Sequence, residues 1–264
     1  MPSDLDDLDQ AAAGYVNHMY QEGEPHGYAG TFLSALSRYI PRARRRIPTA
    51  RQYCRNWERD VHRFRALPMP LSFLKAVVGV AIVKHRLDLA ALLLAGFLGL
   101  LRTGELLMLK VDQLEFSGCL GRVLIRLPRT KTTGWRGQPE QVLLSDPFVV
   151  RALALAVKGL RSQDQVYRSP AHRLAEEIRW LCGILGFRHS RLTPYCLRRG
   201  GATLHFLTFG SLDATAVLGR WQHTSTARIY IEGATAEYVS WQLSASNEIL
   251  RQRLADFAQA FFAA

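Results

Sequence analysis

The sequence has few cysteines and none of the spacings that build a disulfide framework or a zinc site. Its 264 residues hold four cysteines, which lie far apart and form no Cys-x-x-Cys pair. They are Cys54, Cys119, Cys182 and Cys196. Cysteines used in this way are typical of reduced thiols in an intracellular protein.

Long hydrophobic runs are also missing. The longest apolar stretch, residues 89–101, is shorter than the roughly 20 residues that a membrane-spanning helix needs, and it predicts a buried helix instead. The N-terminus, Met-Pro-Ser-Asp-Leu-Asp-Asp, has neither the basic flank nor the apolar core of a signal peptide. No membrane partner is expected.

Several motifs that indicate other kinds of enzyme are absent from the sequence. The sequence has no His-Glu-x-x-His of the zinc proteases, no P-loop with its glycines and lysine, and no Gly-x-Ser-x-Gly. Four early acidic residues are typical of a solvated helix start and make a poor metal cluster: Asp4, Asp6, Asp7 and Asp9. We therefore expect no metal and no small-molecule cofactor.

Positive charge is what the sequence has in excess. It contains 34 lysines and arginines against 22 acidic residues, which gives a net charge of +12 and an isoelectric point near 10.0. A hydrophobic fraction of 48% provides for a sizeable core and argues against disorder. Such a chain favours a polyanionic partner, and nucleic acid is the better candidate once membranes are set aside.

The apolar pattern predicts two parts. The first is a small helical unit over residues 1–66, with helices over 4–22, 27–40 and 49–64. A basic run, Arg44-Arg45-Arg46, lies between two prolines within this unit and is a candidate for DNA-phosphate contacts. The best linker candidate is Leu67-Pro68-Met69-Pro70.

The second part, residues 67–264, predicts a mainly α domain with a small antiparallel sheet, an α+β fold. Helices are expected over 71–86, over 87–101 and from Thr103, strands over 111–116, 123–127 and 141–144, and helices again from Pro147 onward. Helix breaks are expected near Gly159, Pro170, Gly186, Gly210 and Gly233. The tail from Ala234 to Ala264 carries an apolar stripe, which either docks on a neighbouring protomer or completes the core of its own chain.

Four segments stand out by their order and spacing. They are Gly99-Leu100-Leu101-Arg102-Thr103-Gly104-Glu105-Leu106, Arg129-Thr130-Lys131-Thr132, Thr193-Pro194-Tyr195-Cys196-Leu197-Arg198-Arg199-Gly200-Gly201-Ala202-Thr203, and Leu218-Gly219-Arg220-Trp221 followed by Ile229-Tyr230. Together they resemble the catalytic domain of the tyrosine recombinases, the phage integrase family, over residues 70–235, with a weaker match upstream to that family's core-binding domain. The resemblance implies the fold of DNA breaking-rejoining enzymes, duplex DNA as substrate, and a homo-oligomer that works as a synaptic tetramer.

The resemblance assigns the basic residues to one DNA phosphate. Arg102 and Arg198 would clamp it, and the planar, permanently charged guanidinium suits the charge that builds on its oxygens. Glu105 would orient Arg102, and Lys131 would protonate the leaving 5′-oxygen if nearby positive charge lowers its pKa. Two more basic residues of the same connection are expected to contact DNA: Arg129 and Arg136. Taken singly, Arg102 is better explained as a helix cap and Arg198 as a surface charge, and Lys131 is more commonly a solvated loop residue.

The resemblance makes Tyr230 the nucleophile, which would form a 3′-phosphotyrosine. Trp221 lies nine residues earlier, and its indole N–H would donate to a phosphate oxygen without titrating. Both are also ordinary core aromatics when considered in isolation. The sequence departs from the family at Tyr195, where many members have a histidine three residues before the second arginine. A phenol, with a reference pKa of about 10, is a poor base near neutral pH.

Two alternative functions remain open. One is a catalytically impaired relative that keeps the fold and binds DNA, which Tyr195 and the short N-terminal unit favour. The other is an enzyme like the type IB topoisomerases, which share the chemistry and act as monomers. In each case the protein is expected to be intracellular and DNA-associated, in the nucleus of a eukaryote or in the nucleoid or cytoplasm of a bacterium.

Overall fold

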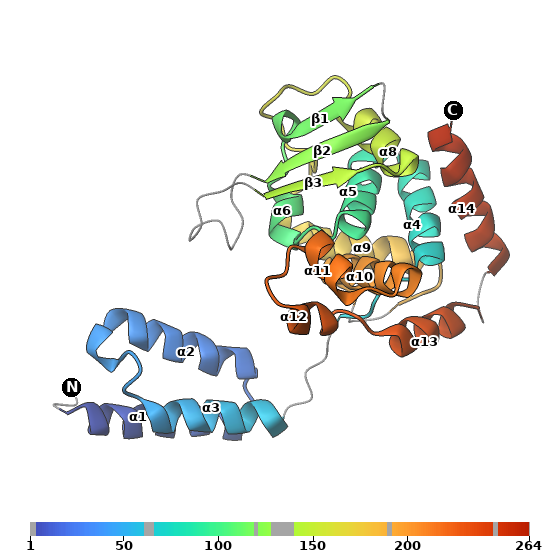
Figure 1. The fold of residues 1–264 in the computed structure, drawn as a ribbon. Coiled ribbons are helices and arrows are strands. Elements are labelled where there is room, and N and C mark those ends of the chain that lie inside the picture. The colour runs from blue at the N-terminus through green and yellow to red at the C-terminus, as the bar shows by residue number, and fades with distance from the viewer. Residues whose placement is uncertain are drawn as a thin grey trace. The chain divides into compact units, whose positions relative to one another are not determined.

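The computed structural model describes residues 4–60, 66–118, 121–127, 140–188, 192–244 and 248–263. The chain divides into two compact units, Met1–Arg65 and Ala66–Ala264 (Figure 1). The division lies beside the proline-containing segment that the sequence marks as a linker.

The first unit packs three helices around its own apolar cluster. They are α1 (Leu5–Gln21), α2 (His26–Tyr39) and α3 (Pro48–Asp60), with a 3₁₀ turn at Pro41–Ala43. The largest buried side chains of the cluster come from every part of the unit: Val16, Met19, Leu33, Ile47 and Trp57. The predicted third helix extends to residue 64, but its last four positions lie outside the described residues.

Asp9 is an exception to the predicted solvated start of α1. Its carboxylate is buried and accepts hydrogen bonds from the backbone N–H groups of Thr49 and Ala50, each at 2.9 Å. Burial opposes the charge of Asp9, but these N–H donors outweigh it and lower its pKa. Asp9 therefore caps the start of α3 across the unit, which a pattern of local acidic residues does not show.

Two apolar helices form the centre of the second unit. α4 (Leu71–Val83) and α5 (Leu87–Leu98) are buried over most of their length, as expected of helices that are hydrophobic on all sides. Helices α8 (Pro147–Val157), α10 (Tyr195–Phe209) and α14 (Glu248–Ala263) pack around them (Figure 1). No helix in the described part of the chain combines the length and apolar character needed to cross a bilayer.

The described part of this unit holds further helices. They are α6 (Thr103–Leu107), α9 (Leu174–Ile184), which follows a 3₁₀ turn at Ala171–Arg173, α11 (Leu212–Gly219), α12 (Thr224–Arg228) and α13 (Gly233–Ser244). The helices of this part end or begin at the predicted breaks, and three of the glycines there have positive φ: Gly159, Gly186 and Gly210.

An antiparallel sheet of three strands completes the described part of the unit. Its strands are β1 (Leu114–Ser117), β2 (Arg122–Leu127) and β3 (Glu140–Leu144), in the order β1-β2-β3. Val123 pairs with Leu144 and Ile125 pairs with Leu114. Alternate residues of β2 are buried, so one face of the sheet joins the core. The predicted mainly α fold with a small antiparallel sheet is confirmed.

The first strand begins later than predicted. Residues Val111–Gln113 form a 3₁₀ turn, although the pattern favoured a strand from Val111. The side chain of Gln113 accepts a hydrogen bond from the backbone N–H of Lys110 at 2.9 Å. The N–H groups of Val111 and Asp112 donate to carbonyls of the 162–164 loop. These bonds replace a sheet ladder.

The helix predicted over 87–101 also ends early, and this positions the site. α5 stops at Leu98 with Gly99 as its cap, and Leu100 adopts φ +46°. That left-handed conformation is unfavourable for a residue with a side chain, by about 1–2 kcal/mol. The sharp turn redirects the backbone, so that Arg102 stands at the N-cap of α6.

Two glycines bring α10 against α5. A Cβ at Gly201 would lie 1.9 Å from the carbonyl oxygen of Phe97, and one at Gly200 would lie 2.1 Å from that of Met69. Backbone contact at this distance is open only to glycine. The Arg-Arg-Gly-Gly sequence therefore places Arg198, one turn earlier on α10, next to the turn that follows α5.

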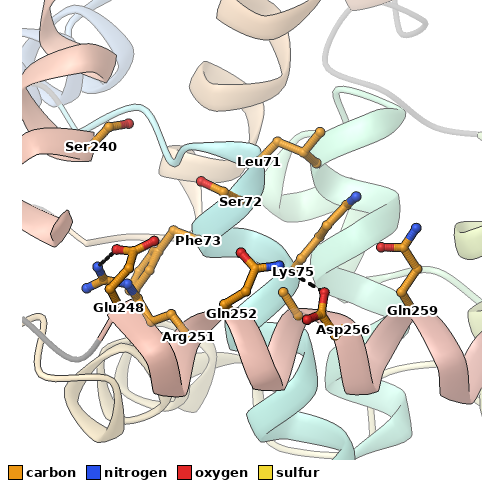
Figure 2. A pocket seen from close by; sticks show the side chains of 11 residues that line it. Leu71, Ser72, Phe73, Lys75, Ser240, Glu248, Arg251, Gln252, Asp256 and Gln259 are labelled. Atoms are coloured by element: carbon orange, nitrogen blue, oxygen red, sulfur yellow. Dashed lines mark hydrogen bonds and ion pairs between the residues drawn. The ribbon is translucent and has the colours of Figure 1, made fainter.

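The C-terminal helix α14 packs along α4 of its own chain (Figure 1). A Cβ at Gly79 would lie 2.2 Å from the carbonyl oxygen of Leu254, and the rings of Phe262 and Phe148 are 4.9 Å apart. Of the two placements left open by the sequence, the structure has the one within the chain. A polar pocket of about 420 Å³ remains between the two helices, with Arg251 ion-paired to Glu248 at one end (Figure 2).

Candidate active site

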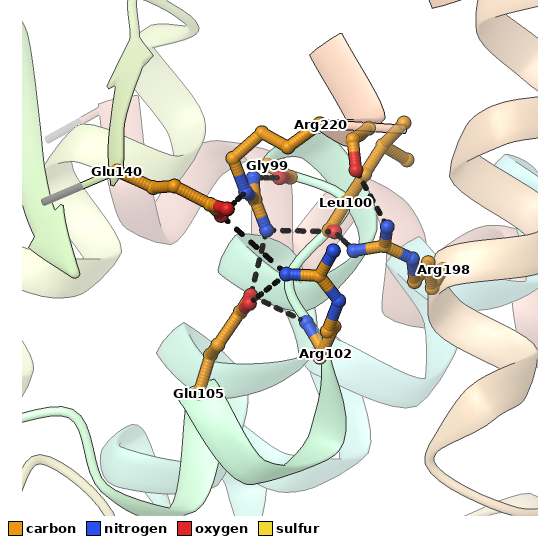
Figure 3. Close-up of polar contacts among 8 residues, drawn as sticks. Gly99, Leu100, Arg102, Glu105, Glu140, Arg198 and Arg220 are labelled. Carbon is orange, nitrogen blue, oxygen red and sulfur yellow. Dashed lines mark hydrogen bonds and ion pairs between the residues drawn. The ribbon is translucent and has the colours of Figure 1, made fainter. Parts of the chain in front are cut away.

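Three arginines and two glutamates meet beside the turn that follows α5 (Figure 3). Arg102 is the N-cap of α6 and Glu105 lies within α6. Arg198 comes from α10, Arg220 from the left-handed C-cap of α11, and Glu140 from the start of β3. The cluster therefore joins four elements that are distant in the sequence.

Glu105 is the acceptor at the centre of this cluster. Its carboxylate accepts the backbone N–H of Arg102 at 2.8 Å, Nη1 of Arg102 at 2.6 Å and Nη2 of Arg220 at 2.6 Å. Its side chain is 4% exposed. Glu140 adds a second carboxylate, which lies 3.0 Å from Nε of Arg220 and 3.4 Å from Nη1 of Arg102.

Arg102 is the most accessible of the three arginines, with a side chain that is 25% exposed. Burial opposes its charge, but its hydrogen bond with Glu105 and the charges of Glu105 and Glu140 outweigh burial and raise its pKa. Only Nη1 of its guanidinium is engaged by other described residues. Nε and Nη2 thus remain available to an incoming acceptor.

Arg198 is almost wholly buried, at 1% exposure. Its Nη1 donates to the carbonyl oxygen of Leu100 and its Nη2 to that of Gly219 at 2.6 Å. Within the described part of the chain its Nε has no partner. Burial lowers the pKa of Arg198 to about 10, and the positive charges of Arg102 and Arg220 contribute. The group stays charged at neutral pH, and none of the described carboxylates forms an ion pair with it.

The rings of Trp221 and Tyr230 lie over this guanidinium. The carbon at the centre of the Arg198 guanidinium lies 4.6 Å from the ring centroid of Trp221 and 5.6 Å from that of Tyr230. The rings of Trp221 and Tyr230 are 4.5 Å apart. Both distances to the cation lie within the range of cation–π attraction.

The hydroxyl groups of Tyr195 and Tyr230 hydrogen-bond to each other. Tyr195 lies in the first turn of α10, one turn before Arg198, so both point to the same face of the helix. Burial raises the pKa of Tyr195 to about 12, and the hydrogen bond with Tyr230 adds to the rise. Tyr195 is therefore a neutral hydrogen-bonding group near neutral pH.

Glycine at position 219 is a condition for this arrangement. A Cβ there would lie 2.0 Å from the ring of Trp221. The ring can lie against the backbone and face Arg198 only because no side chain intervenes. The Gly-x-Trp pattern that stands out in the sequence thus has a steric cause.

The backbone around Tyr230 is held by α10. The hydroxyl of Thr203 donates to the carbonyl oxygen of Tyr230 at 3.3 Å and accepts from the N–H of Glu232 at 3.2 Å. Arg199, 2% exposed, pairs with Glu232 at 2.5 Å. The Arg198-Arg199 pair therefore has two uses: one residue faces the site and the other anchors the segment that carries Tyr230.

The structure brings together six of the residues singled out from the sequence: Arg102, Glu105, Tyr195, Arg198, Trp221 and Tyr230. Lys131, Arg129 and Arg136 lie outside the described residues. Arg44, Arg45 and Arg46 are exposed in the first unit, in the turn before α3. Among the described residues, no group of three histidine, cysteine, aspartate or glutamate side chains is placed to hold a metal ion.

Sequence reasoning missed the partners that organise these residues. Arg220 lies within one of the four segments, but no role was expected of it. Glu140 opens a strand and Thr203 lies within a helix, and neither shows a periodicity or motif that marks it. Their contacts depend on how distant elements pack, which no local pattern contains.

Comparison with known proteins shows the fold. No family model matches the chain, and no curated protein matches its sequence. A lambda integrase dimer bound to a COC′ core site aligns with 86% of this chain and 65% of its own, at 14% identity and a TM-score of 0.59. The chain has the fold of the tyrosine recombinases.

Two further structures with this fold agree. The Tn1549 transposon integrase in complex with a circular intermediate DNA aligns with 88% of this chain and 85% of its own, at 14% identity and a TM-score of 0.53. XerA recombinase aligns with 81% of each chain at 16% identity and a TM-score of 0.51. The predicted DNA breaking-rejoining fold with a helical N-terminal part is thereby confirmed.

The central position of Glu105 leads to a test of stability. Glu105→Gln removes the charge that two largely buried arginines share, and breaking a buried pair from one side is strongly destabilising. We expect a loss of about 3 kcal/mol in the free energy of unfolding, measured by urea denaturation. The matched control is Glu115→Gln, whose exposed pair with Arg126 is worth less than about 1 kcal/mol. Equal losses in the two variants would show that the Glu105 contacts stabilise the fold no more than an exposed ion pair does.

Proposed function

We propose that this chain is a site-specific DNA recombinase that cleaves and rejoins duplex DNA with Tyr230 as its nucleophile. The observation that carries the proposal is that Tyr230 lies against Arg198. The tyrosine stands beside a buried guanidinium that pairs with none of the described carboxylates. A phosphate diester is the anion that complements such a site, because arginine forks match its oxygens. The integrase and recombinase structures with this fold, two of them in complex with DNA, support it.

The reaction balances without an external energy source. The Tyr230 oxygen attacks the phosphorus, the bond to the 5′-oxygen breaks, and a 3′-phosphotyrosine forms. The 5′-hydroxyl of a partner strand then reverses the step, so the phosphodiester count is unchanged. Arg102 and Arg198 stabilise the charge on the non-bridging oxygens, and Lys131 gives a proton to the leaving oxygen.

The proton of Tyr230 leaves through its hydrogen bond with Tyr195. Tyr195 itself is a weak proton acceptor, since its raised pKa of about 12 keeps it neutral. Tyr195 therefore positions the Tyr230 hydroxyl and relays its proton: it accepts that proton while its own hydroxyl proton passes to solvent, to which its side chain is exposed. Activation of the nucleophile is slower than with histidine in this place.

Access to Arg198 requires a rearrangement. At 1% exposure it cannot meet a phosphate while the rings of Trp221 and Tyr230 stay on its guanidinium. Arg102 is open to solvent and is the first arginine that DNA meets. Once the proton has passed to Tyr195, movement of Tyr230 away from Tyr195 frees the nucleophile and opens the path to Arg198.

The proposal extends to DNA and to other copies of the chain. Arg44, Arg45 and Arg46, with Arg129 and Arg136, supply sequence-independent phosphate contacts. Strand exchange between two duplexes requires four nucleophiles, and a synaptic tetramer provides them. The active form is therefore a homo-oligomer assembled on DNA.

A second candidate function is a catalytically impaired DNA-binding relative. The hydrogen bond that ties Tyr230 to Tyr195, together with the raised pKa of Tyr195, favours it. In that case the cluster holds a DNA phosphate but cuts nothing. The two candidates differ in whether a covalent protein–DNA bond forms.

The decisive test is Tyr230→Phe with a substrate pool that contains every short target sequence. Nicked duplexes with a randomised stretch release a short fragment on cleavage and trap the covalent form. The parent should give denaturant-resistant adducts that peptide mapping places on Tyr230, while Tyr230→Phe should bind DNA equally and give none. The control is Tyr238→Phe, an exposed tyrosine on α13. An adduct on another tyrosine would overturn the assignment, and tight binding without any adduct would establish the impaired relative.

The role of Tyr195 is tested by two substitutions. Tyr195→Phe should slow adduct formation in a single turnover, because it removes the hydroxyl that accepts from Tyr230. Tyr195→His should match or exceed the parent, since an imidazole with a reference pKa of about 6.5 accepts a proton at neutral pH. If Tyr195→Phe reacts at the parent rate, the hydroxyl is idle and the residue serves packing alone.

The basic turn of the first unit is tested by salt dependence. Replacing Arg44, Arg45 and Arg46 with alanine should weaken DNA binding and reduce the slope of log affinity against log salt by up to about 3. A fluorescence titration at several salt concentrations measures the slope. Alanine at three exposed arginines of the other unit, Arg161, Arg179 and Arg253, serves as the control for loss of net charge. An unchanged slope in the first variant would show that the turn is an ordinary solvated loop that makes no phosphate contacts.

A further inference from the structure

Arg220 is the most fully engaged side chain of the cluster. Its Nη2 donates to Glu105 at 2.6 Å, its Nε to Glu140 at 3.0 Å, and its Nη1 to the carbonyl oxygen of Gly99 at 3.2 Å. Nη2 also lies 3.4 Å from the carbonyl oxygen of Leu100. Every nitrogen of this guanidinium has a protein partner, and the side chain is 9% exposed. Four of the five N–H donors of Arg220 are thus engaged, which leaves one N–H of Nη1 (Figure 3).

The backbone at this position shows that the arginine has a specific use. Arg220 has φ +56°, a left-handed backbone conformation that residues other than glycine rarely adopt. It stands between Gly219, whose carbonyl binds Arg198, and Trp221, whose ring faces Arg198. A strained residue that lies between two contacts of the site and reaches two carboxylates is a candidate for a functional constraint.

We propose that Arg220 is a positioning residue that neutralises Glu105 and Glu140 and so keeps Arg102 available to DNA. The inference rests on the function proposed above. Glu140 lies within 3.4 Å of Nη1 of Arg102, but Arg220 holds the same carboxylate oxygen at 3.0 Å. Without Arg220, Arg102 is the arginine of the cluster that both carboxylates still contact, and its guanidinium turns toward them.

The charge balance of the cluster gives the proposal a sharp consequence. Three arginines face two glutamates, which leaves one positive charge in surplus to meet an anion. Arg220→Gln brings the surplus to zero, because two arginines then face two glutamates. Adding Glu140→Gln restores it, because two arginines face one. If Arg220 only held the fold together, the double variant would react more slowly than Arg220→Gln alone, since the second change removes further contacts.

The test is the single-turnover rate of adduct formation with a duplex recovered from the randomised pool. Arg220→Gln should react on the order of 10²-fold more slowly, because misplacement of a group that contacts the substrate has effects of that size. The double variant Arg220→Gln with Glu140→Gln should recover most of that loss. Arg161→Gln, an exposed arginine on a loop, should react like the parent.

Two results would overturn the proposal. One is an Arg220→Gln variant that keeps the parent rate, and the other is a double variant no faster than Arg220→Gln alone. Arg220→Lys guards against misfolding of the glutamine variant. Lysine keeps the charge but cannot make four directed contacts, so its rate should lie between those of the parent and Arg220→Gln. A lysine variant as slow as Arg220→Gln would show that charge is not what Arg220 supplies.

A crystal structure of the Arg220→Gln variant separates this proposal from the proposed function. The guanidinium of Arg102 should move toward Glu140 and give up its open Nε and Nη2. If Arg102 keeps its parent position, Arg220 does not set it and the proposal is wrong. If the parent protein forms no adduct on Tyr230, the proposed function fails on its own, and the position of Arg102 in this structure still decides what Arg220 does.

Discussion

The buried carboxylate of Glu105 is the constraint on which the site depends. It accepts a backbone N–H and a guanidinium from Arg102 and a second guanidinium from Arg220, so it fixes α6, the turn after α5 and the end of α11 with one group. The left-handed turn at Leu100 is held from the other side, because its carbonyl oxygen accepts from Arg198. A strained backbone persists where its surroundings determine it in this way.

The electrostatics of the cluster follow from this packing. Arg102 and Arg220 share two carboxylates, while Arg198 has only carbonyl oxygens and aromatic faces around it. Burial and the charges of Arg102 and Arg220 outweigh the opposing effects of Tyr230 and Glu105, and the pKa of Arg198 falls to about 10. An incoming anion would relieve that unfavourable state, and this is the physical reason for proposing a phosphate rather than a neutral ligand at the site.

The sequence predicts the fold and most of the site because both leave local marks. The apolar helices α4 and α5 follow from composition, and the resemblance locates Arg102, Arg198 and Tyr230 from short motifs. What the sequence does not predict are contacts made by packing: Glu140 beside Arg102, or Asp9 capping a helix forty residues away. The early end of α5 is of the same kind, because the turn at Leu100 is stabilised by side chains from α10 and α11.

The most direct test of the account is a crystal structure of the Tyr230→Phe protein with a DNA duplex that the parent cleaves. The account predicts one DNA phosphate within hydrogen-bonding distance of Arg102 Nη2 and of the Arg198 guanidinium, with the ring of residue 230 turned away from Tyr195 and facing that phosphate. A complex in which the duplex crosses the protein with no phosphate at these arginines, and in which Arg198 stays covered by Trp221, would contradict it.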